Sequence, residues 1–167
     1  YIIGGVFNNF VTDILDYFPT NYLGYILNGA ESDNKYVYLT YGPHFGSDRY
    51  LLILSLETNE VLHKLDFINY DRTPDDPGGN FIAQIKDREQ VLYISHWNNG
   101  YAKEYKGKNG YITAIDLKDY EVIWRSNPLV SNTNFIILNN SIITAYGFTK
   151  EPCYLYVINR WNGKVND

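Results

Sequence analysis

The sequence has few of the residues that mark a disulfide-rich fold or an intact translation product. It contains one cysteine, Cys153, and no methionine in 167 residues. A single cysteine cannot form an intrachain disulfide, and the alternating segment around it predicts a buried, inert thiol on a strand. The missing methionine indicates a processed product, a proteolytic fragment or a trimmed chain, from which an N-terminal targeting segment could have been removed.

Long runs of one chemical character are also missing. No stretch of five or more basic residues occurs and the formal net charge is -5, which argues against nucleic-acid binding. No apolar run approaches the roughly 18 residues that a membrane-spanning helix requires. Helical periodicity is absent between the apolar runs, which argues against a parallel sheet with crossover helices.

Known signatures of catalysis are missing as well. The sequence contains no GxSxG, CxxC or HExxH pattern, so no nucleophile or zinc site is indicated. The glycine-containing segment GPHFGSD, residues 42–48, lacks the lysine of a phosphate-binding loop. We therefore assign no catalytic residue, and whether the protein is an enzyme stays open with a preference for a non-enzyme.

Short apolar runs rich in Tyr, Val, Ile and Leu are what the sequence does contain. Aromatic residues make up 17% of the chain and 17 of them are tyrosines, which favours β structure. Gly, Asn, Asp, Ser or Pro bounds each run, as at strand ends. We expect an all-β, antiparallel fold whose strands lie within residues 24–29, 35–42, 49–57, 60–68, 80–85, 90–97, 110–118, 121–126, 134–139, 141–147 and 153–160.

The runs repeat. Ile115 aligns with Leu54 and with Ile158, and without the two long loops 69–79 and 98–109 the unit is near forty residues. About forty residues in four strands is the size of one β-propeller blade. We therefore predict one domain of three to four four-stranded blades, a partial or small propeller. Its blades are expected at residues 24–68, 79–128 and 133–167, after an opening segment at 1–23.

A tight turn recurs between the third and fourth strands of each unit. It needs a residue that reaches positive φ, and Asn59, the pair Asp119–Tyr120 and the pair Asn162–Gly163 stand at that place. A valine follows in each copy. We expect these three valines to point at the next blade: Val61, Val122 and Val165.

The segment GYITAIDLKDYEVIW, residues 110–124, resembles the repeat of quinoprotein-like (PQQ-like) β-propellers. In that repeat a strand ends in Asp, a short turn follows, and the next strand carries x-V-x-W. The Asp and the Trp are Asp116 and Trp124 here. WD40-like repeats have units of similar length, but the Gly-His and Trp-Asp dipeptides are missing.

The other two copies depart from this pattern. The first has Ser55 and His63 at the Asp and Trp positions, and the third has Asn159 and Gly163 but no Trp. The resemblance implies a propeller and, because such repeats are frequent in exported bacterial proteins, an extracytoplasmic location. It implies no activity, because the cofactor and calcium ligands of the PQQ enzymes cannot be placed residue by residue.

Three blades do not close a ring, because an open arc leaves bare strand edges and uncovered faces. The missing blades could belong to a larger propeller, to another chain or to a second copy in a homo-oligomer. Pairing of the N-terminal residues 1–7 with the last blade is a further solution.

The loops between the second and third strands of the blades share one rim. We expect a ligand-binding site where they converge, formed by His44, Asp48, His96, Trp97, Asn98 and Tyr146.

Metal binding is the weaker reading of the acidic residues and histidines. His44 and His96 lack HxH or HxxxH spacing, and ordinary surface roles are favoured. Loop 69–79 gathers three carboxylates that calcium could use, although the alternating ligands of an EF-hand are absent: Asp71, Asp75 and Asp76. The cofactor prediction is therefore open, with calcium as the candidate.

Taken together, these patterns favour a non-catalytic binding or scaffold module. Aromatic residues make good anchors in binding surfaces, so the expected partner is a protein, a peptide or a glycan. The alternative is a segment of a larger quinoprotein-like propeller enzyme.

Overall fold

A computed structural model describes residues 18–67, 80–98 and 100–166. These residues form strands and turns, and none of them belongs to a helix. Consequently, no helix in this part of the chain could cross a membrane. The strands form three antiparallel sheets, so the predicted all-β, antiparallel class is confirmed. Residues 1–17 of the opening segment lie outside the described residues. So do the three acidic residues of the loop 69–79, Asp71, Asp75 and Asp76.

The first sheet has five strands in the order β1-β2-β3-β4-β5. They are β1 (Asn21–Tyr22), β2 (Tyr25–Ser32), β3 (Tyr36–Gly42), β4 (Tyr50–Ser55) and β5 (Val61–Asp66). The short β1 was not predicted. It pairs with β2 through a two-residue turn, Leu23–Gly24, in which both residues have positive φ, as in the tight hairpins of type I′.

The second and third sheets have four and three strands. The second contains β6 (Asn80–Arg88), β7 (Val91–Asn98), β8 (Tyr111–Asp116) and β9 (Val122–Arg125). The third contains β10 (Ile136–Leu138), β11 (Ser141–Tyr146) and β12 (Tyr154–Asn159). Only the second sheet therefore has the predicted count of four. In the third, a single bridge between Ile158 and Val165 stands where a fourth strand would begin.

The turns that follow β4, β8 and β12 are the same. At the first corner, residues 56–60, the Asn59 amide donates to the Ser55 carbonyl (2.9 Å) and the Ser55 amide donates to the Glu60 carbonyl (3.0 Å). The second corner is residues 117–121 and the third is residues 160–164. Matching bonds of 2.8–2.9 Å join Tyr120 to Asp116, Asp116 to Glu121, Gly163 to Asn159 and Asn159 to Lys164. The same hydrogen-bonded corner therefore recurs once in each of the three sheets.

The predicted positive φ at each corner is also confirmed. Asn59, Tyr120 and Gly163 have φ values of 59°, 63° and 71°. The residue at the Asp position tightens each turn with its side chain. Ser55 Oγ, Asp116 Oδ1 and Asn159 Oδ1 accept amide hydrogens at 2.8–3.1 Å. Ser and Asn can replace Asp because an oxygen acceptor is all that the turn requires.

The prediction that the three valines point at the next blade is wrong. Val61, Val122 and Val165 are exposed. A register shift at the start of β5 and of β9 inserts one extra residue, Leu62 or Ile123, against the partner strand. A bulge of this kind changes which side chains face a given side. The residue after the bulge, His63 or Trp124, faces the next sheet instead.

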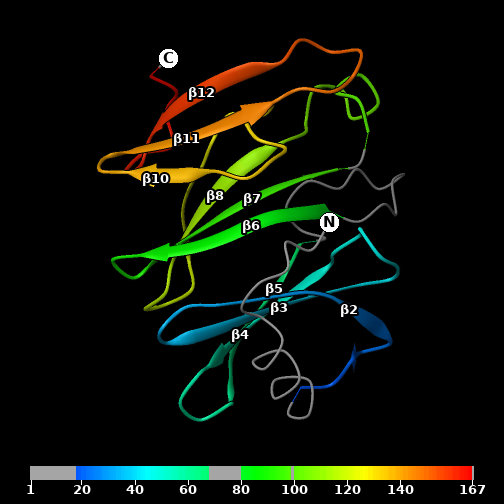
Figure 1. Ribbon diagram of the computed structural model, residues 1–167, viewed down its shortest axis with the longest axis vertical. Coiled ribbons are helices and arrows are strands. Elements are labelled where there is room, and N and C mark those ends of the chain that lie inside the picture. Colours follow the sequence, from blue (N-terminus) through cyan, green and yellow to red (C-terminus); the bar gives the residue numbers. More distant parts are fainter. Residues whose placement is uncertain (1–17, 68–79, 99, 167) are drawn as a thin grey trace, which may run out of the picture.

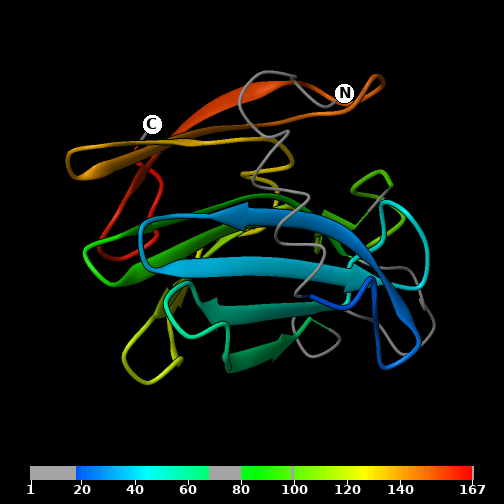
Figure 2. The ribbon, with the colours of Figure 1, turned by 60° about the horizontal axis from the view of Figure 1, so that its bottom comes forward.

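The three sheets stack side by side (Figures 1 and 2). Between the first two sheets, Tyr38, Leu51 and Ile53 belong to one hydrophobic cluster with Leu92 and Ile94. Between the second and third sheets the cluster contains Tyr93, Ile112, Ala114, Trp124, Phe135, Ile142 and Ile158. Each sheet therefore buries an apolar face against its neighbour, and the sheets do not merge into one continuous sandwich.

In the first two sheets, the residue at the Trp position contacts the corner of the following sheet. His63 stacks on Tyr120, with ring centroids 4.2 Å apart and planes only 3° from parallel. Trp124 takes the same role one repeat later: its Nε1–H donates to the Arg160 carbonyl at 3.0 Å. A Cβ at Gly163 would lie 2.4 Å from the Trp124 ring, so only glycine permits this close approach.

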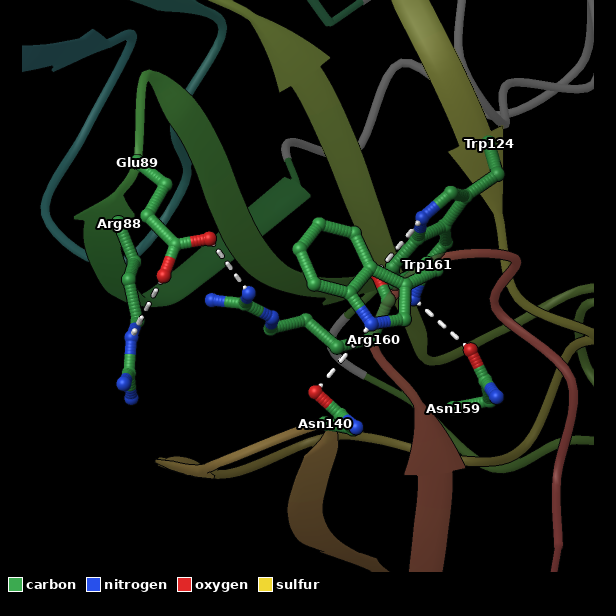
Figure 3. A network of polar contacts seen from close by, with 7 residues as sticks. All are labelled: Arg88, Glu89, Trp124, Asn140, Asn159, Arg160 and Trp161. Carbon is green, nitrogen blue, oxygen red and sulfur yellow. Dashed lines mark hydrogen bonds and ion pairs between the residues drawn. The ribbon is translucent and has the colours of Figure 1, made fainter.

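An ion pair reinforces the same junction (Figure 3). The Arg160 guanidinium is almost fully buried and donates to Glu89, in the β6–β7 turn, at 2.7 Å. The Trp161 ring lies over the guanidinium at 4.0 Å. Leucine fills the corresponding position in the first two corners, Leu56 and Leu117, whose amides make the same backbone bond as that of Arg160. Arg160 therefore distinguishes the junction between the second and third sheets.

Candidate binding surface

The predicted site residues lie in or next to the loops β3–β4, β7–β8 and β11–β12. These loops leave the sheets on the same side, at the right of Figure 1. We call this side the rim. His44 and Asp48 belong to the first loop, Trp97 and Asn98 end β7, and Tyr146 ends β11.

Most of the predicted side chains are inside the protein. Asp48, His96, Asn98 and Tyr146 are buried, Trp97 is half-buried and His44 is exposed. The structure places His44 and Asp48 in a separate cluster with Asn28, while Asn98 and Tyr146 both adjoin Asn109. The buried members of this set therefore support the rim loops from inside the protein and expose little polar surface to a ligand.

His96 is a residue of the core. Its Nε2 is 2.8 Å from Thr113 Oγ1, and its ring contacts Phe67 edge-on and Tyr111 nearly face-to-face. Complete burial, with a smaller contribution from the nearby charge of Arg125, lowers the pKa of His96 to about 3. The imidazole is neutral at physiological pH and does not reach the surface.

The β3–β4 loop is shaped by the side-chain amide of Asn28 on β2. Its Nδ2 donates to the carbonyls of His44 and Ser47 and to Asp48 Oδ1, at 3.0–3.2 Å. Held in this way, the loop presents Phe45 with its side chain 84% exposed. Sequence reasoning missed Phe45, although an aromatic residue flanked by glycine at a loop tip was a usable signal.

The β7–β8 loop is closed by Asn109, which is completely buried. Its Oδ1 accepts the Asn98 amide at 2.7 Å, and its Nδ2 donates to the carbonyls of Asn98 (3.1 Å) and Gly100 (3.0 Å). A side-chain amide satisfies these buried backbone groups, which would otherwise be expensive to leave unbonded.

Asn109→Ala is expected to lower the free energy of unfolding by about 1–3 kcal/mol, because three backbone groups of the loop each lose a hydrogen bond and the buried Asn98 amide loses its acceptor. The loop should open locally, so amide exchange at Asn98 should accelerate more than exchange in the centre of β8. The exposed neighbour provides the control, since Lys108→Ala should change neither quantity. Equal exchange rates in the two variants would show that Asn109 does not hold the loop.

Glu151 joins the β7–β8 and β11–β12 loops. Its Oε1 accepts the Ala102 amide at 2.8 Å and its Oε2 accepts the Tyr146 hydroxyl at 3.3 Å. Burial, followed by the Glu151 carboxylate, raises the pKa of Tyr146 above its ordinary value. The phenol therefore stays protonated and serves as a hydrogen-bond donor.

Three aromatic rings lie over this link. The Tyr101 ring centroid is 5.6 Å from that of Phe148, which is 5.9 Å from that of Tyr146, both in edge-on arrangements. We call Tyr101, Tyr146, Phe148 and Glu151 the rim cluster. Tyr101 and Phe148 are half-buried, so each keeps one part of its ring packed and another part accessible.

The rest of the described surface offers little chemistry. No group of three His, Cys, Asp or Glu side chains among the described residues could hold a metal ion. The predicted burial of Cys153 is wrong, because this residue is exposed after the β11–β12 loop. A cavity of about 430 Å³ lies at the opposite end of the sheets, lined by Asn34, Lys35, Tyr36, Ser55, Leu56 and Glu57.

Neither a family model nor a curated protein matches the sequence. Among solved structures, the chain is similar to the crystal structure of BamB from Moraxella catarrhalis, with a TM-score of 0.52 and 14% sequence identity. The match covers 84% of this chain and 36% of the BamB chain. BamB is a PQQ-like β-propeller, so the three antiparallel sheets correspond to part of such a propeller, and the similarity establishes the fold alone.

Proposed function

We propose that the chain is a non-catalytic binding module of the PQQ-like propeller type, which presents its rim loops to a protein, a peptide or a glycan. The observation that carries this proposal is the rim cluster: accessible parts of Tyr101 and Phe148 are held on two loops that Glu151 links together. Rigid aromatic side chains make strong anchors because little conformational entropy is lost when they are covered.

The buried state of the predicted polar residues supports a binding role over a catalytic one. A catalytic acid, base or metal ligand must reach the substrate, whereas Asp48 and His96 are enclosed by the protein. Phe45 is exposed at the tip of the β3–β4 loop. It would add a further aromatic side chain to those that Tyr101 and Phe148 offer on the rim. The alternative is a segment of a larger propeller enzyme, and the match to 36% of a longer propeller supports the larger propeller without indicating an enzyme.

The proposal is tested by selection against peptide and glycan libraries with the immobilised 167-residue chain. Binders selected on the unmodified chain should lose about 30-fold or more in affinity for the double variant Tyr101→Ser, Phe148→Ser, since hot-spot aromatics contribute about 2 kcal/mol or more. Calorimetry measures the change in Kd.

Trp161→Ser is the matched control, because Trp161 is an exposed aromatic residue at the opposite end of the sheets. Its affinity for the selected binders should be unchanged. Binders that tolerate loss of both rim rings, or that depend on Trp161, would place the binding surface elsewhere.

A further inference from the structure

The outward face of the third sheet is an interface position that none of the described strands covers. The pairs Tyr36–Ser55, Val91–Asp116 and Ser141–Asn159 lie at the same place in the three sheets. Four residues before Ser55, Asp116 and Asn159, on β4, β8 and β12, the equivalent positions are Leu51, Ile112 and Leu155. Leu51 and Ile112 are fully buried in the clusters facing the next sheet, but Leu155 is 70% exposed.

A neighbouring position shows the same difference in burial between the first two sheets and the third. Tyr38 and Tyr93 are buried against the next sheet, while their equivalent, Ile143, is only partly buried. Cross-strand partners in an antiparallel pair point to the same side, so the pairs Ile136–Ile143 and Ile143–Val157 share this face. We call the five residues Ile136, Leu138, Ile143, Leu155 and Val157 the outer face.

The outer face carries aliphatic side chains at the positions equivalent to Tyr38, Leu51 and Ile53, which face the next sheet. Ile136, Leu138 and Leu155 are all more than half exposed. The polar members of the same side are the uncharged Ser141 and Asn159, next to the corner. Exposed aliphatic groups without a charged residue among them mark an interaction surface.

A second copy of the chain does not fit this face. In a head-to-tail arrangement the copy would have to present the other side of its first sheet, where Val37, Leu39 and Leu54 are at most 2% exposed. Two outer faces packed together would bury only roughly 600 Å² from strand spacings and lengths, below the roughly 1,000 Å² of a specific interface.

We propose that the outer face binds a further β-sheet of the same repeat from outside residues 1–167. Such a sheet would present aliphatic side chains like those with which the third sheet meets the second, Ile142 and Ile158, both completely buried there. This inference rests on the repeated packing of the sheets and not on the rim, so it stands or fails independently of the binding function proposed above.

The test supplies such a sheet in the register of the sequence repeat. Asp167 aligns with Trp124, so a tandem variant repeats residues 125–167 directly after Asp167. With Cys153→Ser as background, Leu155→Cys provides a reactive thiol on the outer face. We expect its reaction with a disulfide reagent to be about 10-fold or more slower in the tandem variant than in the 167-residue chain.

Lys150→Cys, on the exposed β11–β12 loop, should react equally fast in both proteins. An unchanged rate at position 155 in a tandem variant that keeps its β-sheet spectrum would overturn the proposal. Light scattering of the 167-residue chain should show a monomer across a wide concentration range. A dimer in which the cysteine at position 155 is protected would equally overturn it, in favour of a second copy.

A second variant needs no added sheet. Leu155→Lys in the 167-residue chain should shift Tm by less than about 2 °C, because an open position tolerates a charge. A fall of more than about 6 °C would show that the outer face is already packed and would contradict the proposal.

Discussion

Trp124→Ala is expected to lower the free energy of unfolding by about 3–5 kcal/mol, the range for removal of a large buried aromatic residue. The Trp124 ring fills the space between Tyr93 and Gly163, and its Nε1–H satisfies the Arg160 carbonyl. Both the packing and the hydrogen bond disappear in the variant. Urea denaturation followed by circular dichroism measures the change.

Two further variants make this prediction specific. Trp124→Phe keeps most of the ring but loses the donor, so a loss of about 1–2 kcal/mol is expected. Ile123→Ala changes the exposed bulge residue next to Trp124 and should alter stability by less than about 1 kcal/mol. Similar losses in Trp124→Ala and Ile123→Ala would mean that the second and third sheets are not held together at this point.

Acid is expected to destabilise the protein through His96. The folded protein keeps this imidazole neutral with a pKa of about 3, whereas the unfolded chain binds a proton near pH 6.5. The unfolded state therefore holds more protons between these values, and stability falls as pH falls. Stability from His96 is complete above about pH 6.5 and decreases by about 1.4 kcal/mol per pH unit below it.

The accumulated effect near pH 3 is of the order of 4–5 kcal/mol. His63 acts in the same direction, because partial burial lowers its pKa more than Glu121 raises it. His96→Gln isolates the larger contribution. Between pH 6.5 and 4, the free energy of unfolding of this variant should fall less steeply than that of the unmodified chain, and the difference in slope should correspond to the binding of about one proton. Parallel curves for the two proteins would refute the assignment.

The strands were predictable because their signal is local. Every apolar run expected to be a strand contains one, from β2 at Tyr25 to β12 at Asn159. The corners were predictable for the same reason, since positive φ at Asn59 and Gly163 follows from residue type. The orientation of Val61 and Val122 was not predictable, because a bulge of one residue reverses the pattern of exposure without changing the composition.

For the candidate site, the sequence indicated the loops but not which side chains the loops enclose. Chain order was enough to bring the three loops to one rim. Burial, however, depends on what lies across the loop, so the sequence does not reveal that His96 and Asp48 are enclosed. Phe45, Asn109 and Glu151 were missed, because their roles arise from bonds to backbone groups distant in the sequence or from exposure at a loop tip.

The sequence by itself determined the antiparallel strands, the corner turns and the three-fold repeat, because alternation, turn residues and spacing act within one unit of about forty residues. Only the tertiary structure decided which side chains are covered. Trp124 is buried because the corner at Gly163 lies against it, and Leu155 is exposed because none of the described sheets packs on the outer face of the third sheet. Burial is a property of pairs of surfaces, and one strand's sequence describes only one member of each pair.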